Sequence, residues 1–246
     1  TMSLAILRIL KDNDINAEVS AGLSLGEYSA LIYSGILDFE TGVKIVQKRG
    51  EYMQNLVPDG EWLMAAVLGM EEEKVEEACK KISKGFAVPV NFNCPGQIVI
   101  SGDKEGVEEA EKILKEMGAR KVRELKTSGP FHTIKLTKAS EELKKELDKI
   151  EIHKQNSLVI KNLDAKPYTE NDDVREILAK HIISPVKFSK SLQEMLDLGV
   201  DTFIEIGPGK TLSGFVKKIE TDKEINILNV NNVETLENVI KFVKEK

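Results

Sequence analysis

The stretch Ala21-Gly22-Leu23-Ser24-Leu25-Gly26-Glu27-Tyr28-Ser29-Ala30 decides the fold of this chain. Short apolar and β-tolerant residues over 15–20 predict a strand before it, and residues 25–33 have a helical pattern that ends at Gly35. Gly-x-Ser-x-Gly is typical of a sharp turn between a strand and a helix. The two glycines remove side chains where the backbones of strand and helix would meet. The sequence therefore predicts an α/β protein in which Ser24 is the nucleophile.

The chemistry available to this serine follows from its place before a helix. Backbone N–H groups in the first turn of a helix have no acceptor, and the helix dipole is positive there. Ser24 can therefore attack a carbonyl carbon while the N–H of Leu25 points at the developing oxyanion. Two glycines around a serine also occur in ordinary turns, so the pentapeptide alone leaves a purely structural turn as the alternative.

Composition limits the class of protein. The chain has 246 residues, of which 41% are hydrophobic and 31% charged, as in water-soluble globular proteins. The net charge of −6 argues against a nucleic-acid surface. Cys79 and Cys94 lack the spacing of a metal or redox pair, so we expect no structural metal and no disulfide. With no bilayer-length apolar run and no signal peptide in the sequence, we expect a cytoplasmic protein without a membrane partner.

A second pattern of alternating strands and helices begins after Pro58-Asp59-Gly60 and continues to Gly129. Its predicted elements are strands at 62–68, 87–91, 97–101 and 121–125 and helices at 71–82 and 104–117. The order β-α-β-β-α-β is that of a ferredoxin-like subdomain. We therefore expect residues 59–129 to be a ferredoxin-like insertion in a large α/β domain with a hydrolase-like parallel sheet, formed by residues 1–58 and 130–246.

An arginine faces inward on the predicted helix 39–56, which Asp38 caps. An advance of about 100° per residue places Arg49 in the apolar arc, beside Val46 and Met53. An inward guanidinium needs an anion. The pattern leaves two alternatives open, a buried carboxylate of this chain or the carboxylate of a ligand.

One of the three histidines is the candidate general base. His132 follows the rigid Pro130-Phe131 at the predicted domain junction, whereas His153 lies in a charged region and His181 at a polar helix end. We expect the latter two to be surface or capping residues. A lone histidine is usually structural, but a serine elbow and a junction histidine form a pair in which the imidazole takes the hydroxyl proton.

Five ordered stretches resemble the malonyl-CoA:acyl carrier protein transacylases. They are G-L-S-L-G-E-Y-S-A (22–30), R-G-E-Y-M-Q (49–54), N-F-N-C-P-G-Q-I-V-I-S-G (91–102), G-P-F-H (129–132) and E-I-G-P-G-K (205–210). The resemblance covers essentially the whole chain. It implies that Ser24 takes malonyl from malonyl-CoA and that the phosphopantetheine thiol of an acidic acyl carrier protein collects it, with no bound metal or cofactor.

The resemblance also implies roles for further residues. Arg49 would hold the malonyl carboxylate, and the ring of Phe131 would leave no room for an α-methyl group. Asn93 would contact the substrate from an amide-rich turn, although simple turn chemistry also explains that turn. The main-chain carbonyl of Ser184, just before a Pro-Val pair, would orient His132 in place of an acid.

Two departures from the family pattern affect what we expect. Leu23 stands where the family usually has a histidine beside the nucleophile. The family's opening strand, with its Gly-Gln-Gly-Ser-Gln turn, has no counterpart before Thr1, so we expect a truncated sequence that lacks one oxyanion-hole donor. Two rival functions remain, a serine esterase or thioesterase and a non-catalytic scaffold that binds carrier protein. A buried Arg49 argues against an esterase of neutral substrates.

Overall fold

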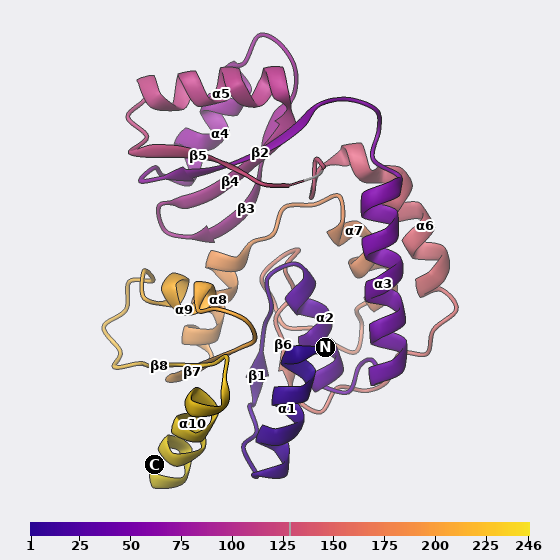
Figure 1. Ribbon diagram of the computed structural model, residues 1–246, viewed down its shortest axis with the longest axis vertical. Coiled ribbons are helices and arrows are strands. Elements are labelled where there is room, and N and C mark those ends of the chain that lie inside the picture. The colour runs from indigo at the N-terminus through magenta and orange to yellow at the C-terminus, as the bar shows by residue number, and fades with distance from the viewer. Residues whose placement is uncertain (128) are drawn as a thin grey trace.

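The structure is a computed structural model that describes residues 1–127 and 129–246 (Figure 1). Parallel strand pairs form its lower half. Strand β1 (Val19–Ser20) pairs with β6 (Leu158–Val159), and β7 (Thr202–Ile206) pairs with β8 (Asn226–Val230). Helices surround these pairs, so this part is an α/β arrangement, as the sequence predicts.

Ten α-helices and one 3₁₀ turn lie in the described residues. Those outside the antiparallel sheet are α1 (Met2–Asp12), α2 (Leu25–Tyr33), α3 (Phe39–Asn55), η1 (Ile134–Leu136), α6 (Thr137–Leu147), α7 (Val174–His181), α8 (Phe188–Asp197), α9 (Thr211–Val216) and α10 (Val233–Glu245). None of the helices in this described part combines the length and hydrophobicity that a membrane span requires.

The strands beside the elbow are shorter than the sequence predicts. Residues 15–20 contribute only Val19–Ser20, and the partner strand β6 has only two residues, Leu158–Val159. In the described part of the chain β1 pairs on one side only, as does β7. A cavity of about 640 Å³ is lined by residues of both strands. β1 and β7 therefore each have one unpaired edge within the described residues, and both strands line the same cavity.

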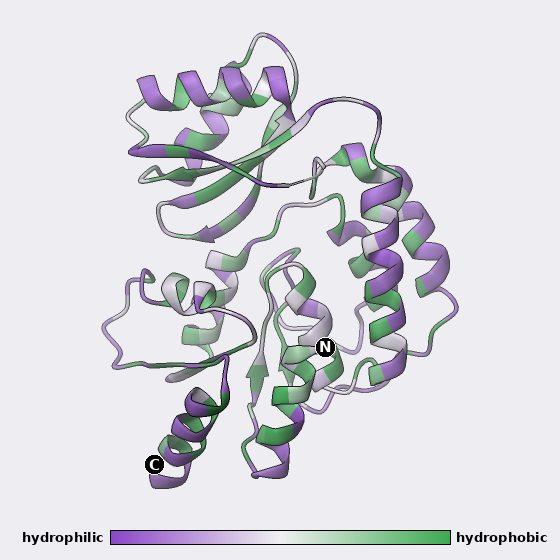
Figure 2. Cartoon of the chain, in the orientation of Figure 1, coloured by the Kyte–Doolittle hydropathy of each residue, from purple (hydrophilic) through white to green (hydrophobic). Residues whose placement is uncertain are grey.

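The upper part of Figure 1 is an antiparallel sheet of order β3-β4-β2-β5 with α4 (Glu72–Lys81) and α5 (Lys104–Glu116) on one face. Its strands are β2 (Trp62–Leu68), β3 (Ala87–Cys94), β4 (Gln97–Asp103) and β5 (Lys121–Leu125). The predicted βαββαβ order is therefore confirmed, and β3 and β4 extend beyond their predicted ends. Both helices turn apolar residues towards the sheet and charged ones outward (Figure 2).

One apolar core holds the elbow helix against three others. Tyr28 and Leu31 of α2, both fully buried, belong to the same cluster as Met53 of α3, Leu143 of α6 and Leu178 of α7. Helix α3 begins after Asp38, whose carboxylate accepts a hydrogen bond from the N–H of residue 41 and so caps the helix as predicted. This packing fixes the ends of α2, α3 and α7 relative to one another.

Candidate active site

Ser24 occupies a strained turn between β1 and α2. Its φ of 51° and ψ of −99° lie where non-glycine residues are seldom found. A Cβ atom at Gly22 would lie 2.0 Å from the carbonyl carbon of Gly26, so only glycine fits at position 22. A Cβ at Gly26 would meet no described atom within 4 Å, so our expectation of a clash at both glycines is wrong for Gly26. Gly26 contributes the backbone that Gly22 approaches.

Asn162 holds this turn in place. Its Oδ1 atom accepts a hydrogen bond from the backbone N–H of Ser24 at 2.7 Å, and its Nδ2 donates to the carbonyl of Gly22 at 2.7 Å. The side chain is fully buried, so both amide groups are satisfied without water. Sequence reasoning missed Asn162, and its position just after an apolar run at 158–160 was the only signal that could have indicated it.

Ser24 and His132 form a pair. The hydroxyl Oγ of Ser24 lies 2.8 Å from Nε2 of His132, and Nδ1 of His132 lies 2.9 Å from the main-chain carbonyl of His181. Burial and the positive charge of Arg49 lower the pKa of His132 to about 4, against which two backbone carbonyls act. The imidazole is therefore neutral near pH 7. The carbonyl of His181 selects the tautomer with a proton on Nδ1, which leaves Nε2 free to accept the serine proton.

The carbonyl that faces His132 is not mainly that of Ser184, as expected from the Pro-Val pair. It belongs to His181, three residues earlier at the end of α7, and the carbonyl of Ser184 has a smaller effect on the pKa of His132 in the same direction. The last carbonyls of a helix have no intrahelical donor and so are available to accept one from outside. We expected His181 to be a surface or capping residue, but it is only 1% exposed and its ring nitrogens have no hydrogen-bond partner among the described residues, so it is neither.

Arg49 reaches the same hydroxyl from α3. Its Nη2 donates a hydrogen bond to Oγ of Ser24 at 2.8 Å, and the guanidinium carbon lies 5.6 Å from the centre of the Tyr28 ring. The side chain is 7% exposed, which agrees with its predicted place in the apolar arc. Across the described residues, no carboxylate lies within ion-pair distance of Arg49 and its Nε has no hydrogen-bond partner. A cation buried in this way retains capacity to bind an anion.

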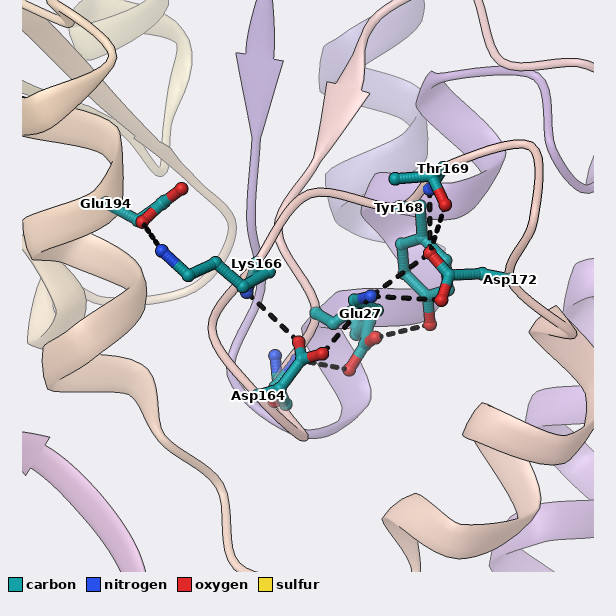
Figure 3. A network of polar contacts seen from close by, with 9 residues as sticks. Glu27, Asp164, Lys166, Tyr168, Thr169, Asp172 and Glu194 are labelled. Atoms are coloured by element: carbon teal, nitrogen blue, oxygen red, sulfur yellow. Dashed lines mark hydrogen bonds and ion pairs between the residues drawn. The ribbon is translucent and has the colours of Figure 1, made fainter.

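A buried carboxylate lies behind the pair, which sequence reasoning missed. Glu27, on α2, is fully buried, and Figure 3 shows its carboxylate meeting the hydroxyl of Tyr168. That hydroxyl donates to Oε1 at 2.7 Å, and Oε2 lies 3.3 Å from Nδ1 of His181. Burial raises the pKa of Glu27 to about 7, although hydrogen bonds from Tyr168 and the N–H of Asn162 oppose that rise. Burial also lowers the pKa of His181.

The other predicted residues lie around this centre without a recorded hydrogen bond to it. Leu25 is the first residue of α2, so its N–H has no acceptor within the helix. Phe131 is half-buried and directly precedes His132, and it packs against the main core and the inner face of the antiparallel sheet. Asn93, in β3, is 6% exposed, and its Oδ1 has no partner among the described residues. Buried amide oxygens are normally paired, so Asn93 retains a free acceptor.

The described part of the chain has no cluster of side chains suited to a metal site. No group of three or more His, Cys, Asp or Glu side chains there could hold a metal ion. Cys79 and Cys94 are free and buried, and burial raises the pKa of the Cys79 thiol to about 12. Neither thiol has the lowered pKa that nucleophilic cysteines need.

Comparison with known proteins shows the family of the chain. Residues 1–239 match the family described as acyl transferase domain. The malonyl CoA-acyl carrier protein transacylase of Bacillus subtilis (strain 168) is 44% identical over 248 aligned positions, which cover 100% of this chain and 78% of the relative.

Solved structures have the same fold. The crystal structure of malonyl CoA-acyl carrier protein transacylase from Clostridium perfringens superimposes with a TM-score of 0.94 at 46% identity, over 99% of this chain and 76% of that one. A malonyl-transacylase solved in complex with a type II polyketide acyl-carrier protein gives 0.93 at 34% identity, over 98% of this chain and 78% of that one. The chain therefore belongs to the acyl transferase domain family, among its malonyl CoA-acyl carrier protein transacylases.

Proposed function

We propose that this protein transfers a malonyl group from malonyl-CoA to the phosphopantetheine thiol of an acyl carrier protein, through an ester on Ser24, and so supplies fatty acid synthesis. The observation that carries the proposal is the meeting of three groups at one atom. Oγ of Ser24 lies 2.8 Å from both Nε2 of His132 and Nη2 of Arg49. Nucleophile, base and anion ligand thus share one site.

The first half-reaction forms the acyl-enzyme. His132 Nε2 takes the hydroxyl proton as Oγ of Ser24 bonds to the thioester carbonyl carbon. The N–H of Leu25 stabilises the oxyanion of the tetrahedral intermediate. The C–S bond then breaks, and the imidazolium returns its proton to the departing thiolate of coenzyme A. Malonyl is left as an ester on Ser24.

The second half-reaction reverses these roles. The thiol of the carrier protein's phosphopantetheine gives its proton to Nε2 of His132 as the sulfur attacks the ester carbonyl. When the tetrahedral intermediate collapses, Oγ of Ser24 leaves and recovers the proton. Each half-reaction is balanced without an oxidant or reductant, because Ser24 carries the acyl group and His132 carries the proton.

Arg49 explains the choice of a diacid. The malonyl carboxylate lies two carbons from the carbonyl that Oγ of Ser24 attacks, and the guanidinium contacts the same Oγ. We propose that Arg49 turns from Ser24 to form a charge-assisted pair with that carboxylate. Phe131 would restrict the α-carbon and Asn93 would donate or accept a hydrogen bond along the substrate. The helix-end carbonyl of His181, assisted by that of Ser184, would keep His132 in its basic orientation.

Two further assignments accompany this proposal. We propose residues 59–129 as a subdomain inserted between 1–58 and 130–246, since β2 to β5 form a separate sheet with its own core. We also propose a cytoplasmic location, because the two free cysteines suit a reducing compartment.

Intact-protein mass spectrometry tests the proposed function. After incubation with malonyl-CoA, one malonyl adduct should appear, and Ser24→Ala should abolish it. His132→Ala should slow adduct formation by about 100-fold or more, because an unassisted serine is a poor nucleophile at neutral pH. Adding phosphopantetheinylated carrier protein should discharge the adduct as malonyl-carrier protein, whereas discharge as free malonate would indicate a thioesterase. An adduct that survives Ser24→Ala would refute the assignment of the nucleophile.

A further inference from the structure

Glu27 is an ionisable side chain that the proposed mechanism does not use. It lies three residues after Ser24 on α2 and is fully buried. Carboxylates are almost never fully buried unless they are paired, because leaving water is costly for a charge. The partners of Glu27 therefore indicate what it does.

One branch of its contacts leads to the nucleophile. Oε2 of Glu27 accepts a hydrogen bond from the backbone N–H of Asn162 at 3.3 Å. The side chain of that same residue binds the carbonyl of Gly22 and the N–H of Ser24, each at 2.7 Å. Asn162 contacts the elbow at Gly22 and at the N–H of the nucleophile itself, so its position sets the orientation of the Ser24 side chain. Glu27 holds the backbone from which that amide extends.

The other branch leads to the base. Oε2 of Glu27 lies 3.3 Å from Nδ1 of His181, an ion-pair distance that lacks the alignment of a full hydrogen bond. His181 presents its main-chain carbonyl to Nδ1 of His132 at 2.9 Å, and the two imidazole rings lie 5.2 Å apart between centroids. The side chain of His181 thus lies against Glu27 while its carbonyl orients the base.

We propose that Glu27 is a positioning residue for the Ser24–His132 pair, acting on the serine through Asn162 and on the histidine through His181. Because it concerns that pair, the inference rests on the proposed function. The hydroxyl of Tyr168 fixes the other carboxylate oxygen at 2.7 Å, so the carboxylate is held at both ends (Figure 3). One buried group thereby couples the two segments that carry nucleophile and base, which lie 108 residues apart in sequence.

The loss expected on replacing Glu27 follows from geometry. A glutamine has the same shape but only one oxygen, so it can accept from the hydroxyl of Tyr168 or from the backbone N–H of Asn162, and not from both as Glu27 does. With the amide nitrogen towards Asn162 two donors meet, and with it towards Tyr168 the buried hydroxyl loses its acceptor. A shift of about 1 Å between reacting groups can cost about 100-fold in rate. The substrate contacts proposed for Arg49 are not altered by this change.

The decisive experiment is a double-mutant cycle on the acylation step. Glu27→Gln should lower the single-turnover rate of acylation by malonyl-CoA by about 10- to 100-fold, while the concentration for half-maximal rate changes less than about twofold. When His132 is already alanine, Glu27→Gln should cost a factor at least about threefold smaller than in the parent, because only its effect on the serine through Asn162 then remains to be lost. The control is Glu40→Gln, which removes an exposed ion pair with Lys44 on α3 and should leave acylation unchanged.

A merely structural Glu27 gives a different result. Glu27→Gln would then lower the melting temperature and leave the acylation rate intact, or it would lower the acylation rate by the same factor with and without His132. Either outcome overturns the proposal. If Glu27→Gln does not fold, His181→Ala decides by the same criteria, since it removes the contact with Glu27 and keeps the main-chain carbonyl. Failure of the proposed function is recognised separately, because the adduct of the parent protein would then survive Ser24→Ala.

Discussion

The guanidinium of Arg49 donates a hydrogen bond to the hydroxyl of Ser24, with Nη2 and Oγ 2.8 Å apart. The cation and the nucleophile come from neighbouring helices, α3 and the N-terminus of α2. No carboxylate within the described residues neutralises Arg49 at ion-pair distance. The positive charge of Arg49 also lowers the pKa of His132, although burial lowers it more. Arg49 therefore acts on the nucleophile, on the base and, as proposed, on the substrate.

Removing Arg49 should change selectivity between acyl groups. A hydrogen bond to a charged group contributes about 1.5–3 kcal/mol, so Arg49→Ala should lose about 10- to 150-fold in kcat/KM with malonyl-CoA. Acetyl-CoA has no carboxylate to lose and should be affected much less. Steady-state rates with the two thioesters check this prediction. Equal losses would mean that Arg49 serves the fold or the nucleophile instead of the malonyl group.

The pH dependence of acylation should reflect the lowered pKa of His132. The base must be neutral to accept a proton, and its pKa of about 4 means that it is neutral throughout the range above about pH 5. We therefore expect His132 to contribute a fall in kcat/KM for malonyl-CoA only near pH 4. The pKa of Glu27 is about 7, so the test uses Glu27→Gln, in which kcat/KM should be flat from about pH 5 to 8. A descending limb centred at the ordinary histidine value of 6.5 in that variant would contradict the prediction.

Arg49→Met provides the matched control for that profile. Loss of the positive charge removes one of the two causes that lower the pKa of His132, so the acidic limb should move to higher pH. Circular dichroism at each pH separates titration of the base from acid unfolding. An unmoved limb would show that burial alone sets the pKa.

Local patterns predicted the elements whose ends are set by neighbouring residues. The bounds of α2, β2 and β5 agree with the sequence, because turn residues and apolar periodicity determine them. The lengths of β1 and β6 could not be predicted in this way. A strand extends only as far as an edge is available to pair with, and no residue inside the segment specifies that edge.

The site was predictable to the extent that its residues carry a motif. Ser24, His132 and Arg49 were indicated by an elbow, a junction and a helical arc, and the structure brings them together. Glu27 and Asn162 were missed because they act through contacts across 135 and 138 residues, which no local pattern encodes. The burial of His181 could not be predicted for the same reason. The packing of α7 buries this histidine although it follows a lysine in the sequence.

The two glycines of the elbow should respond oppositely to alanine. A Cβ at position 22 would lie 2.0 Å from the backbone of Gly26, so Gly22→Ala must displace strand or helix and should destabilise the protein by several kcal/mol, about the magnitude of a severe core defect. At position 26 the added methyl group would contact no neighbouring atom. Position 26 belongs to helix α2, and alanine is favoured over glycine in a helix by about 1 kcal/mol. Thermal unfolding of both variants should show a large decrease for the first and no decrease for the second. Comparable losses would mean that the elbow backbone differs from the one described.

Transfer to the acyl carrier protein should depend on lysines that acylation does not use. The candidates are Lys187, Lys190, Lys210, Lys217 and Lys218, and the last three are exposed at the two ends of α9. Lys190 lies 3.9 Å from Glu72 of the antiparallel sheet's first helix, so its charge is partly used within the protein. Lys210 and Lys217 are the clearer test, because neither has an ion-pair partner among the described residues.

Charge reversal at those two positions should separate the half-reactions. The double variant Lys210→Glu and Lys217→Glu should slow discharge of the malonyl-enzyme by carrier protein by about fivefold or more at low salt, because complementary charge mainly accelerates encounter. Self-acylation from malonyl-CoA should keep its rate, and raising the ionic strength to about 0.5 M should reduce the difference between parent and variant. The control is Lys74→Glu with Lys112→Glu on α4 and α5, which makes the same change in net charge elsewhere. Equal effects of both double variants would reflect net charge alone, and unchanged discharge by the first would place the docking surface away from α9.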